Sequence, residues 1–137
     1  VDAERLPREP ELADLALDTF PLSRQTAVGN ALRSGVPVLT LKGRNFASRL
    51  GASLVTAAGM PELAVDDAKA FHDTAVRLAS NPKELAGLRA KLAEGRATAP
   101  LFDLQHLRRH LERAFEMMAE RHAKGLAPAS FSVPSLS

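Results

Sequence analysis

Residues 36–41 read Val-Pro-Val-Leu-Thr-Leu, a short run that is apolar at almost every position and rich in β-branched side chains. A strand that is buried on both faces of a parallel sheet has this composition, because helices cover both of its faces. Pro37 stands near the start of the run, where a missing backbone donor is tolerated. The run therefore predicts a central strand and favours an α/β fold.

The segments before this run predict a helix and, ahead of it, either a strand or the end of another helix. Residues 25–33 place Val28 and Leu32 on one helical face, and Gly35 follows as a stop signal. Residues 12–18 are short, apolar and followed by a turn, and their periodicity leaves open a buried strand or the end of a helix.

After the run, a helix is expected from about residue 45 to residue 58, where Gly59 ends it. Its larger apolar side chains recur at a spacing of four, at Phe46, Leu50 and Leu54. The order strand, helix, strand, helix is typical of a doubly wound α/β sheet. A third strand at residues 64–65 stays an alternative.

The rest of the chain predicts helices. We expect Asp66 to cap one helix, Asn81-Pro82 to open the next, and Asp103 to cap a long final helix that Gly125 ends. Their apolar positions are Phe71, Ala75 and Leu78; Leu85, Leu88 and Leu92; and Leu104, Leu107, Leu111, Phe115 and Met118.

The strand count indicates a partial domain. A free-standing doubly wound domain needs about five or six strands, so we expect the second half of such a sheet, with the missing strands before Val1. A lone fragment would hide its exposed sheet edge by pairing with another copy. The expected organisation is an extended lead-in or linker over 1–11, a partial Rossmann-like domain over 12–125 and a tail over 126–137.

Composition excludes several functions. With 18 basic and 16 acidic residues, no Trp and no Tyr, a platform for nucleic acid is not expected. The sequence has no Cys, which excludes disulfides and thiol catalysis and favours the cytoplasm. No apolar run reaches the length of a membrane helix, so a membrane partner is not expected.

Chemistry is expected in two loops, at residues 19–25 and 42–45. Each would follow the carboxyl end of a parallel strand, where ligands bind in such sheets, and each leads into a helix N-terminus. Unpaired N–H groups there attract phosphate. Thr26 falls in the first turn of its helix, and Asn30 lies four residues later on the same face.

Each of these residues also has an ordinary structural interpretation. Ser23 or Thr26 can cap the helix, and Asn30 can be a surface amide; from periodicity alone these roles are more frequent than ligand contacts. His106 and His110 stand at a metal-pair spacing, but no third ligand completes a motif, so no metal site is predicted.

Two clusters of charge also favour structural roles. Arg108, Arg109 and Arg113 alternate with glutamates, which indicates a salt-bridged helix face. Asp14 and Asp18 are paired carboxylates only in sequence, and nothing else marks them as acid and base.

One stretch resembles a known family. Residues 11–55 read ELADLALDTFPLSRQTAVGNALRSGVPVLTLKGRNFASRLGASLV. They are similar to the C-terminal catalytic region of O-GlcNAc transferases of the SPINDLY type, which typically read L-A-D-x-x-L-D-T-x-P-Y-N-x-H-T-T-x-x-D-A-L-W-A-G-V-P-V-L-T-x-x-G-E-x-F-A-S-R. The resemblance continues through GMPEL, RATAPLFD and LERAFEMMAERHAKG, so it covers nearly all of residues 12–125.

The resemblance implies a GT-B glycosyltransferase, in which two Rossmann-like domains face a cleft, often behind tetratricopeptide repeats. Such enzymes transfer a sugar, usually GlcNAc from UDP-GlcNAc, to Ser or Thr hydroxyls of proteins, and they need no metal or other cofactor. This chain would be the latter part of the second domain. Its partners would be the nucleotide sugar, the acceptor protein, the missing N-terminal catalytic half and the tetratricopeptide repeats.

The resemblance also implies site residues. In the family, a His-Thr-Thr motif opens the helix that meets the donor pyrophosphate, and a following Asp holds the ribose. Thr26 matches the first Thr, whereas Gln25, Ala27 and Asn30 stand where the family has His, Thr and Asp. An uncharged Asn bonds a ribose hydroxyl more weakly than Asp does.

Further departures lie around this motif. Ser23 and Arg24 replace Asn and a small residue, and Arg44 replaces a Glu at the cleft rim, so all three are candidate donor contacts. The family's uracil-binding segment has no match in residues 3–8. Three interpretations stay open: a transferase with an altered donor, such as another hexose or a nonulosonic acid; a UDP-sugar enzyme that binds its donor weakly; and an inactive GT-B-like module that binds protein.

Overall fold

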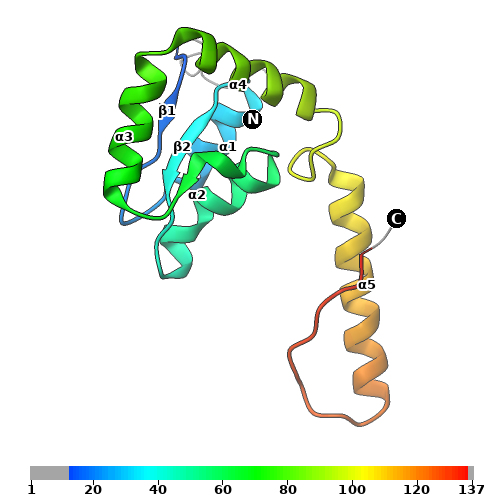
Figure 1. Cartoon of the computed structure of the whole chain (residues 1–137). Coiled ribbons are helices and arrows are strands. Elements are labelled where there is room, and N and C mark those ends of the chain that lie inside the picture. The colour runs from blue at the N-terminus through cyan, green and yellow to red at the C-terminus, as the bar shows by residue number, and fades with distance from the viewer. Residues whose placement is uncertain (1–12, 136–137) are drawn as a thin grey trace, which may run out of the picture. The chain divides into compact units, whose positions relative to one another are not determined.

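The computed structural model describes residues 13–135 of the chain, and the lead-in expected at residues 1–11 lies outside this range (Figure 1). By its internal contacts the chain divides into two compact units, the first ending at Phe102 and the second beginning at Asp103. The domain expected over residues 12–125 spans that boundary.

A small parallel sheet organises the first unit. Its strands are β1 (Ala16–Leu17), β2 (Val38–Leu41) and β3 (Ala64–Val65), in the order β1-β2-β3. Ala16 pairs with Val38, and Thr40 pairs with Ala64. Residues 12–18 therefore contribute a strand, and the alternative third strand is present. Val36 and Pro37 are buried as expected but precede the paired part of β2.

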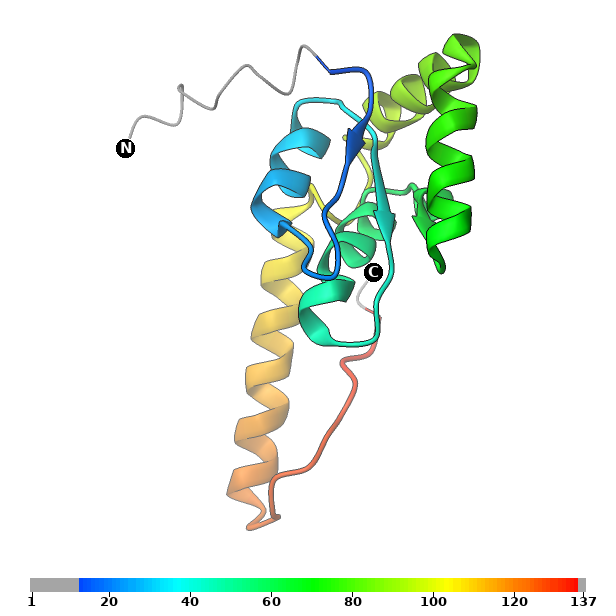
Figure 2. The same ribbon diagram turned by 90° about the vertical axis from the view of Figure 1, so that its left-hand side faces the viewer.

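Helices cover the two faces of this sheet. The elements are α1 (Gln25–Arg33), α2 (Phe46–Ala57), the 3-10 turn η3 (Pro61–Leu63), α3 (Ala68–Ala79) and α4 (Pro82–Gly95). Figure 2 shows α1 and α2, in blue and teal, on one side of the strands and α3, in green, on the other. The helix-rich α/β fold predicted from the sequence is confirmed.

The core lies between the helices and β2. Burying these side chains removes apolar surface from water, which is the main driving force for the fold. The largest fully buried members are Leu32, Val36, Val38, Leu39, Val55, Met60, Leu63, Leu78 and Leu92.

The predicted helix ends are confirmed where glycine supplies them. Gly35 follows α1 with φ 81°, and Gly59 follows α2 with φ 82°. A side chain is strained in this left-handed conformation, whereas glycine adopts it freely. These two residues therefore let the chain leave each helix and return to the sheet.

One sequence expectation in this unit is wrong in detail. The cap of α3 is Asp67, which accepts a hydrogen bond from the Ala70 N–H at 2.7 Å, whereas Asp66 pairs with Lys42. The larger apolar residues of α2 differ in burial: Phe46 is 81% exposed, whereas Leu54 packs against the core. The buried face of α2 carries smaller residues, namely Ser48, Gly51, Ala52 and Val55. Small side chains let the helix approach the strands closely.

The second unit is built on α5 (Leu104–Ala123), which Asp103 caps as predicted by accepting from the His106 N–H at 2.8 Å. Its apolar stripe is exposed within the unit. The arginine-rich side is a salt-bridged face, as expected, with Arg108 bonded to Glu112 at 2.9 Å. None of the helices in residues 13–135 combines the length and apolarity needed to cross a membrane.

Candidate functional site

A buried carboxylate organises the loop that follows β1. Asp18 lies at the carboxyl end of this strand and is 9% exposed. Its Oδ1 accepts hydrogen bonds from the backbone N–H groups of Thr19, at 2.9 Å, and Arg24, at 3.1 Å. Its Oδ2 accepts from the hydroxyls of Ser23, at 2.6 Å, and Thr40, at 2.8 Å. These donors satisfy the buried charge and fix the course of the loop.

Gly51 leaves the room that this network needs. A Cβ atom at residue 51 would lie 2.6 Å from the Thr40 Oγ1 and 2.7 Å from the Ser23 Oγ, and it would also contact the Asp18 carboxylate. Heavy atoms cannot pack that closely, so a side chain here would push the polar groups apart. Helix α2 therefore contacts the Asp18 network directly through its backbone.

The first turn of α2 holds the loop from its other side. The Ser23 N–H donates to the Ala47 carbonyl at 3.3 Å. Asn45 and Ser48 cap α2 reciprocally: the Ser48 N–H donates to the Asn45 side chain at 2.9 Å, and the Asn45 N–H donates to the Ser48 hydroxyl at 3.2 Å. The loop is thus fixed between β2 and α2 before it enters α1.

The N-terminus of α1 lacks a side-chain cap. Arg24 occupies the cap position without a capping hydrogen bond, and the Val28 N–H donates to the Arg24 carbonyl at 3.0 Å. The N–H groups of Gln25, Thr26 and Ala27 precede that bond and have no partner within the helix. The structural interpretation in which Ser23 or Thr26 caps this helix is therefore wrong.

A hollow of about 480 Å³, here called the first hollow, opens beside these amides. It is lined by residues 22–27 together with Asn30 and Leu50. Thr26 is exposed and Asn30 is half-buried, and their spacing of four places them on one side of α1. An uncapped helix N-terminus and an amide side chain therefore share one hollow at the carboxyl end of β1.

The predicted donor contacts are brought together here, with one exception. Ser23, Arg24, Gln25, Thr26, Ala27 and Asn30 all line the first hollow. The Ser23 hydroxyl, however, donates its hydrogen to Asp18. Arg44 lines a neighbouring hollow instead. The geometry brings these residues to one place, and their contacts with a donor stay predictions.

The neighbouring hollow, here called the second hollow, is larger, at about 1030 Å³. Most of its lining residues belong to α2, and one of them, Leu50, lines both hollows. Its charged lining residues are Lys42, Arg44 and Arg49, and no carboxylate of residues 13–135 lines it.

The other candidates from the sequence serve local structure. The ring centroids of His106 and His110 lie 4.1 Å apart, and the His110 Nδ1 is 2.9 Å from the His106 carbonyl oxygen. Within residues 13–135, no three His, Asp or Glu side chains gather as metal ligands would. Asp14 pairs with Arg89 on the surface at 2.7 Å.

Sequence reasoning missed the role of Asp18, together with Thr40 and Leu50. In the sequence pattern Asp18 stands out only through its spacing from Asp14. One signal was present, because Gly51 interrupts an otherwise apolar helical pattern. Such a glycine costs helix stability and commonly marks a close approach of another group.

The fold and the hollows define a class. A parallel sheet with helices on both faces, and an uncapped helix beginning at a strand's carboxyl end, belong to doubly wound α/β domains that bind ligands at that edge. The chain belongs to glycosyl transferase family 41, whose profile matches residues 2–111.

Individual relatives agree. The chain is 35% identical over 127 residues to a probable UDP-N-acetylglucosamine–peptide N-acetylglucosaminyltransferase, SEC, of Arabidopsis thaliana, covering 92% of this chain and 13% of that protein. It is 32% identical over 119 residues to the UDP-N-acetylglucosamine–peptide N-acetylglucosaminyltransferase of Caenorhabditis elegans, covering 87% of this chain and 10% of the relative.

A solved structure extends the likeness to three dimensions. A mutant O-GlcNAc transferase of Thermobaculum terrenum superposes with a TM-score of 0.76 at 34% identity. The match covers 83% of this chain and 22% of that chain. The resemblance inferred from the sequence, and the expected GT-B type of fold, are thereby confirmed.

Proposed function

We propose that this chain supplies the nucleotide-binding part of a glycosyltransferase that moves a sugar from a nucleotide-sugar donor to Ser and Thr hydroxyls of proteins. The relatives are named for transfer of N-acetylglucosamine from its UDP form to peptides, so UDP-GlcNAc is the first donor to test. The nucleotide sugar is a substrate, and the proposal includes no metal or other cofactor.

One observation carries this proposal: the uncapped N-terminus of α1 opens into the first hollow. Three N–H groups, of Gln25, Thr26 and Ala27, lie where the helix dipole places about half a positive charge. A diphosphate matches both the charge and the number of donors. The Thr26 hydroxyl adds a further donor for a phosphate oxygen.

The remaining lining suits the rest of a nucleotide sugar. Asn30 stands one helical turn beyond Thr26, and its amide can exchange hydrogen bonds with a ribose hydroxyl. Arg24 is exposed at the rim and adds positive charge. The volume of about 480 Å³ falls within the range of small-molecule sites.

Most of the enzyme would lie outside this chain. Because the chain covers 13% of the Arabidopsis relative, we propose that the other catalytic half and tetratricopeptide repeats belong to the same protein. The groups that activate the acceptor would come from that part, so the chain alone should be inactive. The proposed compartment is the cytoplasm.

Calorimetric titration of the full-length protein tests the proposal. We expect heat of binding with UDP and UDP-GlcNAc and less with CMP. If a CMP-linked nonulosonic acid bound in place of UDP-GlcNAc, the proposed transferase function would stand, but with a different donor. An absence of binding with all of these nucleotides would favour the inactive protein-binding module.

A further inference from the structure

The second hollow lies beside the proposed donor site but is separate from it. Leu50, on α2, lines both hollows, while Lys42, Arg44 and Arg49 line only the second. Lys42 and Arg44 of its lining come from the loop after β2, at the same sheet edge as the loop after β1. A chain that lies in the second hollow would therefore pass close to a sugar held at the first.

The charge of the second hollow is one-sided. Lys42 pairs with Asp66 at 2.7 Å, but that pair is exposed. Arg44 and Arg49 are exposed, and within the described part of the chain neither takes part in an ion pair. Three cations and no carboxylate of the described residues line the second hollow, and its two arginines have no ion-pair partner there, which favours an anionic occupant.

The second hollow also has an apolar lining. Phe46 is 81% exposed, and Leu50 and Pro61 also line this hollow. Exposing a large aromatic ring is unfavourable in water, and such rings are enriched where proteins bind other chains. Cations around an apolar surface match a polypeptide that carries both carboxylates and apolar side chains.

We propose that the second hollow binds an acidic segment of the acceptor polypeptide, next to the hydroxyl that receives the sugar. This inference rests on the proposed function, because it assigns an acceptor to the donor site beside it. Arg44 and Arg49 would contact the carboxylates, and Phe46 would pack against an apolar side chain of the same segment. The hollow is thus a determinant of acceptor specificity.

The test measures peptide binding directly, so that it does not depend on turnover. Fluorescence anisotropy with full-length protein would compare two labelled Ser-containing peptides, one rich in Asp and Glu and one with the matched Asn and Gln. We expect the acidic peptide to bind more tightly, and added salt to reduce the difference because salt screens exposed charges.

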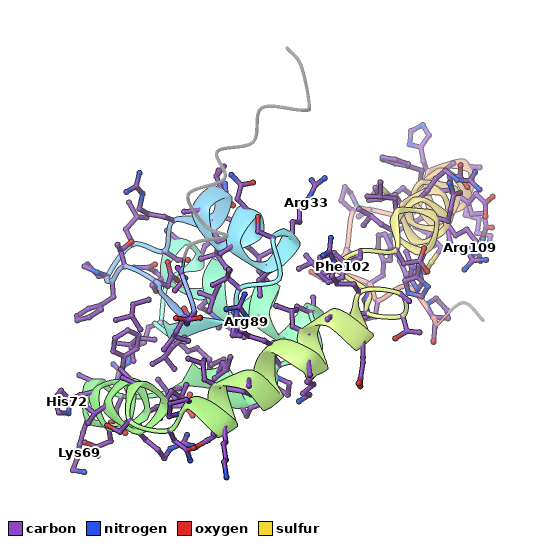
Figure 3. All side chains as sticks on the ribbon, turned by 90° about the horizontal axis from the view of Figure 1, so that it is seen from above. Arg33, Lys69, His72, Arg89, Phe102 and Arg109 are labelled. Carbon is purple, nitrogen blue, oxygen red and sulfur yellow. The ribbon has the colours of Figure 1, made fainter. Side chains whose placement is uncertain are left out.

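Arginine variants assign the effect to the second hollow. Arg44→Gln combined with Arg49→Gln should weaken the acidic peptide by about fivefold, the value expected for two exposed ion pairs. The control pair, Arg33→Gln with Arg96→Gln, removes equal charge from exposed positions that line neither hollow. Figure 3 shows Arg33 extending away from α1. The control should bind both peptides as the native protein does.

UDP titration of the same proteins separates the two proposals. Unchanged UDP affinity in the Arg44 and Arg49 variant, together with weaker acidic-peptide binding, would support the inference. Equal binding of the two peptides, or equal losses in the variant and the control, would overturn it. A loss of UDP affinity in the variant would assign the second hollow to the donor and also overturn it, while failure of native protein to bind UDP would count against the proposed function alone.

Discussion

The Thr40 hydroxyl lies 2.8 Å from the Asp18 carboxylate, and this hydrogen bond joins β2 to the loop after β1 across 22 residues of sequence. The same carboxylate accepts from the backbone N–H of Arg24, the residue in the cap position before α1. Asp18 therefore connects the sheet to the helix N-terminus that opens into the first hollow. Its position decides where the three uncapped amides point.

Replacing Asp18 should destabilise the fold. In Asp18→Asn, an NH₂ group would replace one of the two carboxylate oxygens, each of which accepts two hydrogen bonds. The donors that bond to that oxygen would lose their acceptor in a buried site. We expect the free energy of unfolding to fall by about 2–3 kcal/mol, measured by urea denaturation. Asp14→Asn is the matched control: its exposed pair with Arg89 should contribute less than about 1 kcal/mol. Equal losses in the two variants would contradict a central role for Asp18.

Adding a methyl group at Gly51 should have a similar effect through packing. Gly51→Ala would press against the Asp18 network, and overpacking of this kind costs about 1–3 kcal/mol. Gly87→Ala provides the control, because no atom lies within 4 Å of the added Cβ in α4. That variant should be stabilised by about 1 kcal/mol, the difference in helix propensity. If urea denaturation showed both Gly51→Ala and Gly87→Ala to be more stable than the native protein, α2 would not approach the Asp18 network this closely.

Thr26 tests the assignment of the diphosphate. Thr26→Ala removes the hydroxyl and keeps the backbone amide, so UDP binding should weaken by about 1–2 kcal/mol in calorimetry of the full-length protein. Thr56→Ala, an exposed threonine on α2 that lines only the second hollow, is the control. UDP affinity that is unchanged in Thr26→Ala would remove this residue from the proposed site.

Asn30 tests the assignment of the ribose. A carboxylate accepts a hydroxyl hydrogen bond more strongly than an amide does, so Asn30→Asp should tighten UDP binding, by about 1 kcal/mol. The effect should be smaller for a 2′-deoxy-UDP probe, which lacks one ribose hydroxyl. Weaker binding of UDP to the variant would show that residue 30 does not face the ribose.

The exposed cluster on α3 gives a pH prediction. The pKa of the Asp73 carboxyl is below its ordinary value because Lys69, and then His72, hydrogen-bonds to it. The cluster therefore contributes its stability above the ordinary carboxyl pKa, and this is lost as the pH falls through the lowered value. Titration by nuclear magnetic resonance should show the Asp73 pKa rising in Lys69→Met. An unmoved pKa would mean that the pair does not persist in solution.

Local signals in the sequence were sufficient for much of the fold. A glycine follows α1 and another follows α2, and Asn45 and Asn81 precede the helices that they cap. Each of these effects acts within one turn, so the sequence pattern alone reveals it. The adjacent carboxylates at residues 66 and 67 are not distinguished on that basis; in the structure Asp67 caps α3, and Asp66 contacts Lys42 from another part of the chain.

The site was only partly predictable, for a related reason. Thr26 and Asn30 share a helix face, and their spacing predicted that they would lie together. The Asp18 network joins the loop after β1 to Thr40 of β2 and packs against Gly51 of α2, and no periodicity connects these residues. Phe46 and the small residues of α2 present two rows that both fit a helix, so only the packed structure shows which row faces the strands.

The Leu50 side chain lines both the first and the second hollow, so one residue contributes to the wall of each. A larger residue at this position would narrow both at once, and a smaller one would widen both. If the first hollow binds the donor and the second binds the acceptor, a substitution of Leu50 during evolution would change the selectivity for both substrates together. Steady-state kinetics of a Leu50→Ala enzyme would then show altered Michaelis constants for donor and acceptor together.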